Sequence, residues 1–139
     1  MTGFGYNVNG FGAFATRGNA IEATGGTTST SGGFKFHKFT SSGTFQITKA
    51  AGGGFSSTVD YIVIAGGGAG GGEHENSGNA AGGGGGAGGY LTGTFTGNAA
   101  SHSITIGGGG ASETNSGSNS SLGSEATATG GGGGGAVNA

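Results

Sequence analysis

The sequence predicts an all-β fold: a glycine-rich β-sandwich with packed, polyglycine-type extended segments and no significant helix. Three observations lead to this prediction. Forty-one of the 139 residues are glycine, and none is proline. The glycines gather in blocks, of which 82–86 and 130–135 are the longest. Short segments with alternating aromatic or β-branched residues separate the blocks, and no window has the 3.6-residue period of an amphipathic helix.

The first strand signals lie on either side of a turn-like segment, Thr-Ser-Ser-Gly at 40–43. Residues 34–39 and 44–48 alternate apolar and polar side chains, which predicts a β-hairpin whose aromatic and β-branched residues face a core. Phe39 falls out of phase with Phe34 and Phe36. We therefore expect a bulge or a strand end near Lys38.

Further strands follow along the chain. Residues 59–65 are apolar on both faces beyond Asp60, which is typical of a central, covered strand. Residues 90–96 and 101–106 are two more candidates, and 125–129 is a weaker one.

The glycine blocks predict a bundle of extended helices. A glycine segment can form an extended threefold helix that rises about 3.1 Å per residue and has no internal hydrogen bonds. Its N–H and C=O groups must then find partners elsewhere, and neighbouring blocks can supply them. Disorder is the alternative for a glycine-rich polar chain, but the strand-like segments between the blocks argue against it. Loops would emerge at the ends of such a bundle, where a stiff scaffold positions binding residues.

Composition excludes several partners and functions. Only ten residues are charged and the net charge is −2, so there is no basic patch and we expect no nucleic acid partner. The chain has no cysteine, which excludes disulfides and thiolate metal sites. The longest apolar run, 61–65, is far shorter than the roughly 20 residues of a membrane-spanning helix. We expect no membrane insertion.

Residues 60–68, Asp-Tyr-Ile-Val-Ile-Ala-Gly-Gly-Gly, are similar to the "EYLVVAGGGGGG" core of the glycine-rich domain found in many bacteriophage tail-fibre proteins. Residues 36–45 resemble its "HxFTSSGTF" segment, and 85–94 its "GGAGGYRTGT" segment. The resemblance covers about 25–135. A looser similarity extends to the distal adhesins of T-even-like phages, whose glycine-rich motifs form a polyglycine sandwich with receptor-contacting loops at its tip.

This resemblance implies a virion protein, a component of a tail fibre or spike that binds a glycan or protein of the host cell surface. The alternative is a capsid or tail decoration protein that stabilises the particle without binding a receptor. Other virion proteins are implied partners. A homo-oligomer is expected, with a trimer favoured because fibres are usually trimeric.

We divide the chain into an N-terminal docking arm, 1–24, and a glycine-rich β domain, 25–139. The arm interleaves four aromatic residues with glycine and asparagine, and a disordered tail is the alternative. Docking onto another virion protein or a neighbouring subunit would involve Phe4, Tyr6, Phe11 and Phe14.

The densest polar cluster lies between two glycine blocks, at 73–79, and it is our first choice for contacting a receptor. Its candidate residues are Glu73, His74, Glu75, Asn76 and Asn79. A solvated loop tip and a metal site are the alternatives; in an extended loop the two glutamates point away from the histidine, so we predict no metal. The second loop, 111–124, is read as a spacer or as a sugar-contacting segment because it is rich in Ser and Asn.

Catalysis is not expected. His37 and His102 lie in predicted strands, where packing or hydrogen bonding explains them better than a catalytic role. No nucleophile elbow precedes a helix, and the glycine runs create Gly-x-Gly-x-x-Gly matches automatically. The sequence therefore indicates a binding or structural protein that is not an enzyme and has no cofactor.

Overall fold

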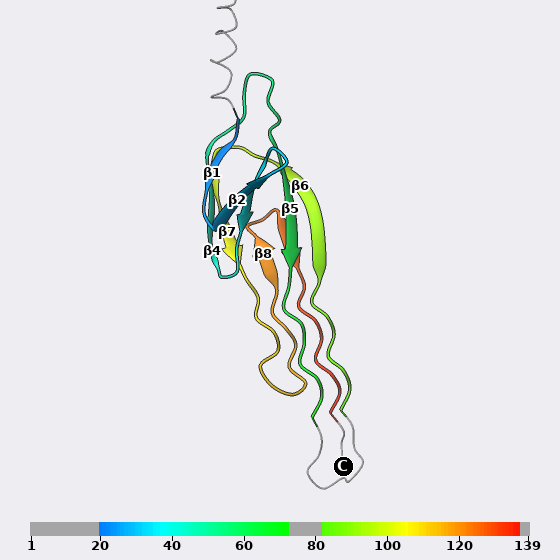
Figure 1. The fold of residues 1–139 in the computed structure, drawn as a ribbon. Helices are drawn as coiled ribbons and strands as arrows, with labels where there is room; N and C mark the ends of the chain where they lie inside the picture. The colour runs from blue at the N-terminus through cyan, green and yellow to red at the C-terminus, as the bar shows by residue number, and fades with distance from the viewer. Residues whose placement is uncertain (1–19, 73–81, 137–139) are drawn as a thin grey trace, which may run out of the picture.

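The computed structural model describes residues 20–72 and 82–136, and within them it confirms the all-β prediction: every regular element is a strand. Figure 1 shows two parts along one axis, a layered region of strands and a set of extended segments that project from one end of it. The strands are β1 (Glu22–Thr24), β2 (Thr27–Ser31), β3 (Phe34–Lys38), β4 (Gly43–Lys49), β5 (Thr58–Ile64), β6 (Tyr90–Thr96), β7 (Ala100–Thr105), β8 (Ser120–Leu122) and β9 (Ala126–Ala128).

One layer is a five-stranded antiparallel sheet in the order β1-β4-β7-β8-β9. Phe45 and Ile47 alternate with polar residues along β4, and both are buried. The antiparallel register places Phe45 opposite His102, and Ile104 opposite Leu122. Because side chains alternate across a strand, this register directs one apolar face of the sheet towards the second layer.

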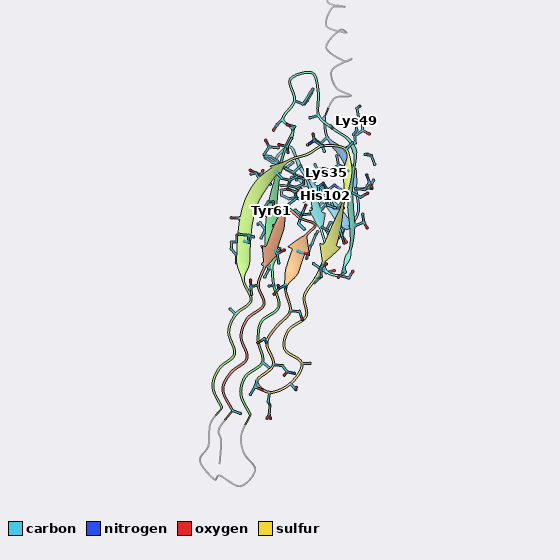
Figure 2. The ribbon with its side chains drawn as sticks, turned by 180° about the vertical axis from the view of Figure 1, so that it is seen from behind. Lys35, Lys49, Tyr61 and His102 are labelled. Carbon is cyan, nitrogen blue, oxygen red and sulfur yellow. The ribbon has the colours of Figure 1, made fainter. Side chains whose placement is uncertain are left out.

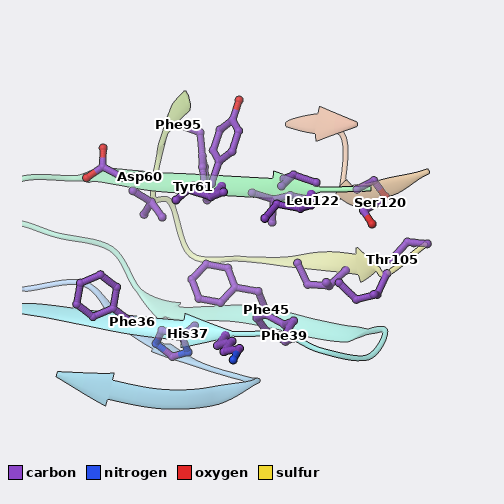
Figure 3. A pocket seen from close by; sticks show the side chains of 18 of the residues that line it. Phe36, His37, Phe39, Phe45, Asp60, Tyr61, Phe95, Thr105, Ser120 and Leu122 are labelled. Atoms are coloured by element: carbon purple, nitrogen blue, oxygen red, sulfur yellow. The ribbon is translucent and has the colours of Figure 1, made fainter. Parts of the chain in front are cut away.

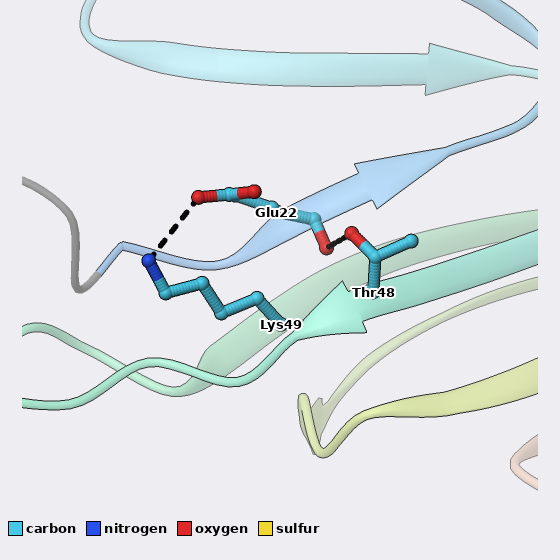
Figure 4. Close-up of polar contacts among 3 residues, drawn as sticks. All are labelled: Glu22, Thr48 and Lys49. Atoms are coloured by element: carbon cyan, nitrogen blue, oxygen red, sulfur yellow. Dashed lines mark hydrogen bonds and ion pairs between the residues drawn. The ribbon is translucent and has the colours of Figure 1, made fainter.

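Polar contacts hold the short edge strand β1 against β4 (Figure 4). The Lys49 ammonium lies 3.3 Å from the Glu22 carboxylate, and the Thr48 hydroxyl donates to the Glu22 carbonyl oxygen at 3.1 Å. The Lys49 and Glu22 side chains are 42% and 62% exposed, so solvent screens this ion pair and it contributes less than about 1 kcal/mol. Ala23 adds the one buried side chain of the strand.

The second layer consists of two separate hairpins, β2-β3 and β5-β6. The ring of His37 in β3 lies 5.1 Å from the ring of Phe45 in β4, while β5 contacts β8 and β9. Both hairpins therefore cover the same face of the main sheet, one over β4 and the other over β8 and β9, and the fold is sandwich-like with a divided second layer. The buried apolar residues between the layers are Ala23, Phe45, Ile47, Val63, Ala65, Ile104, Leu122, Ala126 and Ala128.

The predicted hairpin between 34–39 and 44–48 is wrong. β3 pairs with β2, and β4 pairs with β1 and β7, so the turn-like segment 40–42 carries the chain from one layer to the other. The β2 sequence, Thr-Thr-Ser-Thr-Ser, is fully exposed and has no apolar alternation that could indicate a strand. Phe34 and Phe36 consequently lie exposed instead of facing the core. The predicted strand end at Lys38 is confirmed.

β5 is a strand as predicted, but it is not covered on both faces. Val63 is buried, whereas Ile62 and Ile64 are 64% and 61% exposed. The reason is that β5 pairs with β6 alone within the described chain, and nothing described there lies over its outer face.

β1 lies within the residues that the sequence assigns to the arm, 1–24. Its pairing with β4 and the burial of Ala23 make Glu22–Thr24 part of the sheet.

Candidate functional site at the end of the glycine bundle

Five extended stretches project from the strands and run side by side; we call them the glycine bundle. β5 continues into the first, the second leads into β6, β7 continues into the third, the fourth leads into β8, and β9 continues into the fifth (Figures 1 and 2). In chain order they are 65–72, 82–89, 107–110, 115–119 and 130–135. Strands therefore set both the start and the direction of each stretch.

Hydrogen bonds in the bundle repeat every three residues. Stretch 65–72 donates to the antiparallel stretch 82–89 through its first, fourth and seventh N–H groups: Ala65 to Gly89, Gly68 to Gly86 and Gly71 to Gly83, at 2.9, 2.8 and 2.7 Å. The N–H group that follows each of the first two donors points to stretch 115–119 instead: Gly66 donates to Ser118 and Ala69 to Asn115, at 3.1 and 2.9 Å. A three-residue period is that of an extended threefold helix.

Parallel pairing also occurs. Gly131 donates to Gly66 and Gly134 to Ala69, each at 2.8 Å, so 130–135 runs in the same direction as 65–72. Gly110 adds a further contact by donating to Gly67 at 2.9 Å. Stretch 65–72 is thus central, with hydrogen bonds to all four other stretches. The predicted bundle of parallel and antiparallel glycine helices is confirmed.

Most of these positions have no space for a side chain. A Cβ atom on Gly68 would overlap the carbonyl oxygen of Gly132, and one on Gly131 would overlap that of Gly86. Other glycines face outwards: Gly84 and Gly132 would meet no atom within 4 Å. Glycine at the inward positions allows backbones to approach closely enough for direct hydrogen bonding between stretches.

Side chains replace backbone partners where the fourth stretch passes into β8. Asn119 Oδ1 accepts from the Gly130 N–H at 2.9 Å, and the hydroxyl of the buried Ser120 accepts from the Gly107 N–H at 2.9 Å. Reading 111–124 as one spacer or sugar-contacting loop is therefore wrong. Its second half is bundle and strand, where these polar groups satisfy internal N–H groups.

The far end of the bundle is where the predicted receptor-contacting residues attach to the scaffold. Glu73, His74, Glu75, Asn76 and Asn79 themselves lie outside the described residues. The described residues on either side of them, Gly72 and Gly82, lie at the end of the bundle furthest from the strands (Figure 1).

Glu113 belongs to this end as well, because its carboxylate lies where a Cβ atom of Gly72 would be. It stands in the exposed turn 111–114, in which Thr114 has a φ of 64° and donates to the Gly70 carbonyl oxygen at 3.3 Å. Left-handed backbone at a β-branched residue is unusual and is associated with functional sites. The sequence places Glu113 in a second loop but contains no signal that it meets Gly72.

The glycine-rich domain model matches residues 39–139, which is most of the chain. The chain belongs to the glycine-rich domain family. Neither the curated proteins nor the solved structures contain a match to it.

In this glycine-rich domain the histidines of the described strands pack against aromatic rings, as the sequence predicts. His37 Nδ1 is 2.7 Å from the Gly25 carbonyl oxygen. His102 lies between Phe45 and Phe95, with ring centroids at 6.2 and 4.9 Å, and its buried Nε2 has no hydrogen-bond partner in the described structure.

The described parts of the glycine-rich domain contain neither a metal-ligand cluster nor a membrane-spanning helix. Among these residues no three His, Cys, Asp or Glu side chains come together as a metal site would require. The same residues contain no helix that could span a membrane. The predicted docking residues Phe4, Tyr6, Phe11 and Phe14 lie outside the described residues.

Proposed function

We propose that this glycine-rich domain is a phage virion component, carried on a tail fibre or spike, that contacts the host cell surface through the far end of its glycine bundle. It acts by binding and has no catalytic step. The contacting residues are Glu73, His74, Glu75, Asn76 and Asn79, and Glu113 stands beside them. The partner is a surface glycan or protein, and the fibre assembly makes the protein a homo-oligomer, with a trimer favoured.

One observation carries the proposal: the attachment points of 73–81 lie at the end of a hydrogen-bonded bundle, away from the strand layers. Gly71, two residues before this segment, donates to Gly83, two residues after it, at 2.7 Å. The roots of the loop are therefore fixed relative to each other and held far from the rest of the domain. A rigid scaffold that presents a polar loop at its end suits recognition of a large surface, which could not enter a deep cleft.

The test is adsorption of the purified, fluorescently labelled protein to a panel of bacterial strains. The variant Glu73→Ala/His74→Ala/Glu75→Ala is compared with the wild type and with a matched control, Glu22→Ala/Lys49→Ala. The control also removes exposed charges, but at the opposite end of the molecule (Figure 2). We expect saturable binding by the wild type and the control, and at least tenfold weaker binding by the triple variant.

Equal binding by the triple variant would contradict the proposed site. Absence of saturable binding on every strain, from protein that melts cooperatively, would contradict receptor recognition. Glu113→Gln gives a second measurement at a described residue, with a smaller loss expected because one neighbouring charge is removed.

The second candidate function is decoration of the particle, and the exposed apolar side chains of β5 favour it. Ile62 and Ile64 are too exposed for a face that meets only water, and contact with another virion protein would cover them. Decoration predicts that deleting residues 1–20 removes the protein from particles and makes them fragile. Exchanging the loop 73–79 would then leave adsorption unchanged.

A further inference from the structure

An apolar groove of about 770 Å³ separates the two hairpins of the second layer (Figure 3). β3 forms one wall and β5 the other. Phe45, Ile104 and Leu122 of the main sheet line it from beneath. The groove lies where the divided layer lacks a strand, between a hairpin that packs on β4 and one that packs on β8 and β9.

The walls present strand edges as well as side chains. Consecutive residues line the groove on both sides, 35–38 in β3 and 59–64 in β5. Since successive side chains point to opposite faces of a strand, lining by consecutive residues means that the edge itself faces the groove. Within the described chain β3 pairs with β2 alone, and β5 with β6 alone. Both edges therefore have backbone groups available for an added extended segment.

The N-terminal segment meets the domain at one end of this groove. A Cβ atom on Gly97 would lie 2.8 Å from Ile21 Cδ1 and 2.9 Å from Val59 Cγ2. The Ile21 and Val59 side chains are therefore neighbours. Val59 lines the groove at the start of β5. A chain that continues from Ala20 towards residue 1 thus starts at the groove, and Gly18-Asn19 has the chemistry of a turn.

The segment 1–19 has the length and the side chains to fill the groove. Nineteen extended residues reach about 60 Å, whereas a strand of the length of β5 spans only about 23 Å. The segment carries Phe4, Tyr6, Val8, Phe11 and Phe14 among small and polar residues. Its one charged side chain is Arg17, and Asp60 is the acidic residue of the groove wall.

We propose that residues 1–19 of this chain bind in the groove of their own domain as an extended segment antiparallel to β5. With Arg17 opposite Asp60, Phe14 lies opposite the buried Val63 and covers the apolar lining of the groove. The direction follows from the junction, because the segment must run towards Val59, where β5 begins. The proposal is independent of host recognition: it concerns what completes the sandwich.

The test uses the full chain, which has no native cysteine. Tyr61→Cys places a thiol on β5 at the groove, on the face of the strand that is directed towards the main sheet. Thr127→Cys places one on the exposed side of β9 as a control. The measurement is the rate at which each thiol reacts with a maleimide, at several protein concentrations. Each thiol is measured with the natural N-terminal segment and with a segment that carries Phe4→Ser, Tyr6→Ser, Phe11→Ser and Phe14→Ser.

We expect the Tyr61→Cys thiol to label at least tenfold more slowly with the natural N-terminal segment than with the serine-substituted one, independently of protein concentration. The Thr127→Cys thiol should label at the same rate with both segments. Equal labelling of the Tyr61→Cys thiol with both segments would overturn the proposal. Protection that depends on protein concentration would also overturn it, because a neighbouring copy would then cover the groove, and protection that survives the serine substitutions would exclude the segment as the occupant.

Discussion

Adding one methyl group to the glycine bundle tests how closely its stretches pack. Gly131 and Gly132 are adjacent in stretch 130–135. A Cβ atom on Gly131 would overlap the carbonyl oxygens of Gly86 and Ala87, whereas one on Gly132 would meet no atom within 4 Å. We therefore compare Gly131→Ala with Gly132→Ala in the full chain.

The magnitude follows from the hydrogen bonds that must yield. Stretch 82–89 has to move away from a methyl group at position 131, and three N–H groups of this stretch donate to 129–135 at 2.7–2.9 Å. Each bond contributes about 1 kcal/mol net, and overpacking costs about 1–3 kcal/mol. We expect Gly131→Ala to lower the free energy of unfolding by about 2–4 kcal/mol. Gly132→Ala should be neutral, or stabilising by about 0.4–1 kcal/mol, because alanine restricts the unfolded chain.

Calorimetric melting is the assay, since the chain has no tryptophan to serve as a fluorescent probe. One kcal/mol corresponds to about 4 °C for a domain of this size, so Gly131→Ala should melt about 8–16 °C below the wild type. Gly132→Ala should melt at or slightly above the wild-type temperature. Equal melting temperatures for the two variants would refute the packing argument, because the variants differ only in which face of the stretch carries the methyl group.

Three further predictions concern the strand layers and use the same melting assay. Ser120→Ala should lower the free energy of unfolding by about 1–2 kcal/mol because it leaves the Gly107 N–H without its acceptor, whereas Ser121→Ala should change it little. Equal effects of the two substitutions would contradict the role of the Ser120 hydroxyl as that acceptor. His102→Phe should leave the free energy of unfolding unchanged or raise it by about 1 kcal/mol, because it removes a buried ring nitrogen without a hydrogen-bond partner. A decrease of more than about 2 kcal/mol would mean that this nitrogen has a partner. Ile47→Ala should cost about 2–5 kcal/mol because its side chain is fully buried, and a loss below about 1 kcal/mol would show that the core is loosely packed there.

Strong local signals made the strands β4 to β7 predictable from the sequence. β6 and β7 contain alternating residues such as Phe95 and Ile104, and their bounds lie close to the predicted ones. The bundle was predictable because a glycine block without internal hydrogen bonds needs external partners. β1, β2 and β8 escaped prediction because Glu-Ala-Thr, Thr-Thr-Ser-Thr-Ser and Ser-Ser-Leu are too short or too polar to show an apolar alternation. Their pairing depends on contacts with β4, with β3, and with β7 and β9.

Exposure was the other property that the sequence could not determine. The run Tyr-Ile-Val-Ile-Ala at 61–65 has the same composition whether one or both faces of its strand are covered. Only the arrangement of the two hairpins decides that Ile62 and Ile64 face outwards. The meeting of Glu113 with Gly72 likewise depends on the phase of two distant stretches, which no local pattern records.

The three-residue period of the bundle limits how its gene can change in length. Loss of one glycine codon turns the rest of a stretch by a third of a turn, so each N–H group points at a different neighbour. Loss of three codons restores the phase and shortens the stretch by about 9 Å. Stretches 65–72 and 82–89 pair with each other on either side of one loop, so they must shorten together. Changes of length that keep this hydrogen-bond register are therefore steps of three codons made in matched stretches.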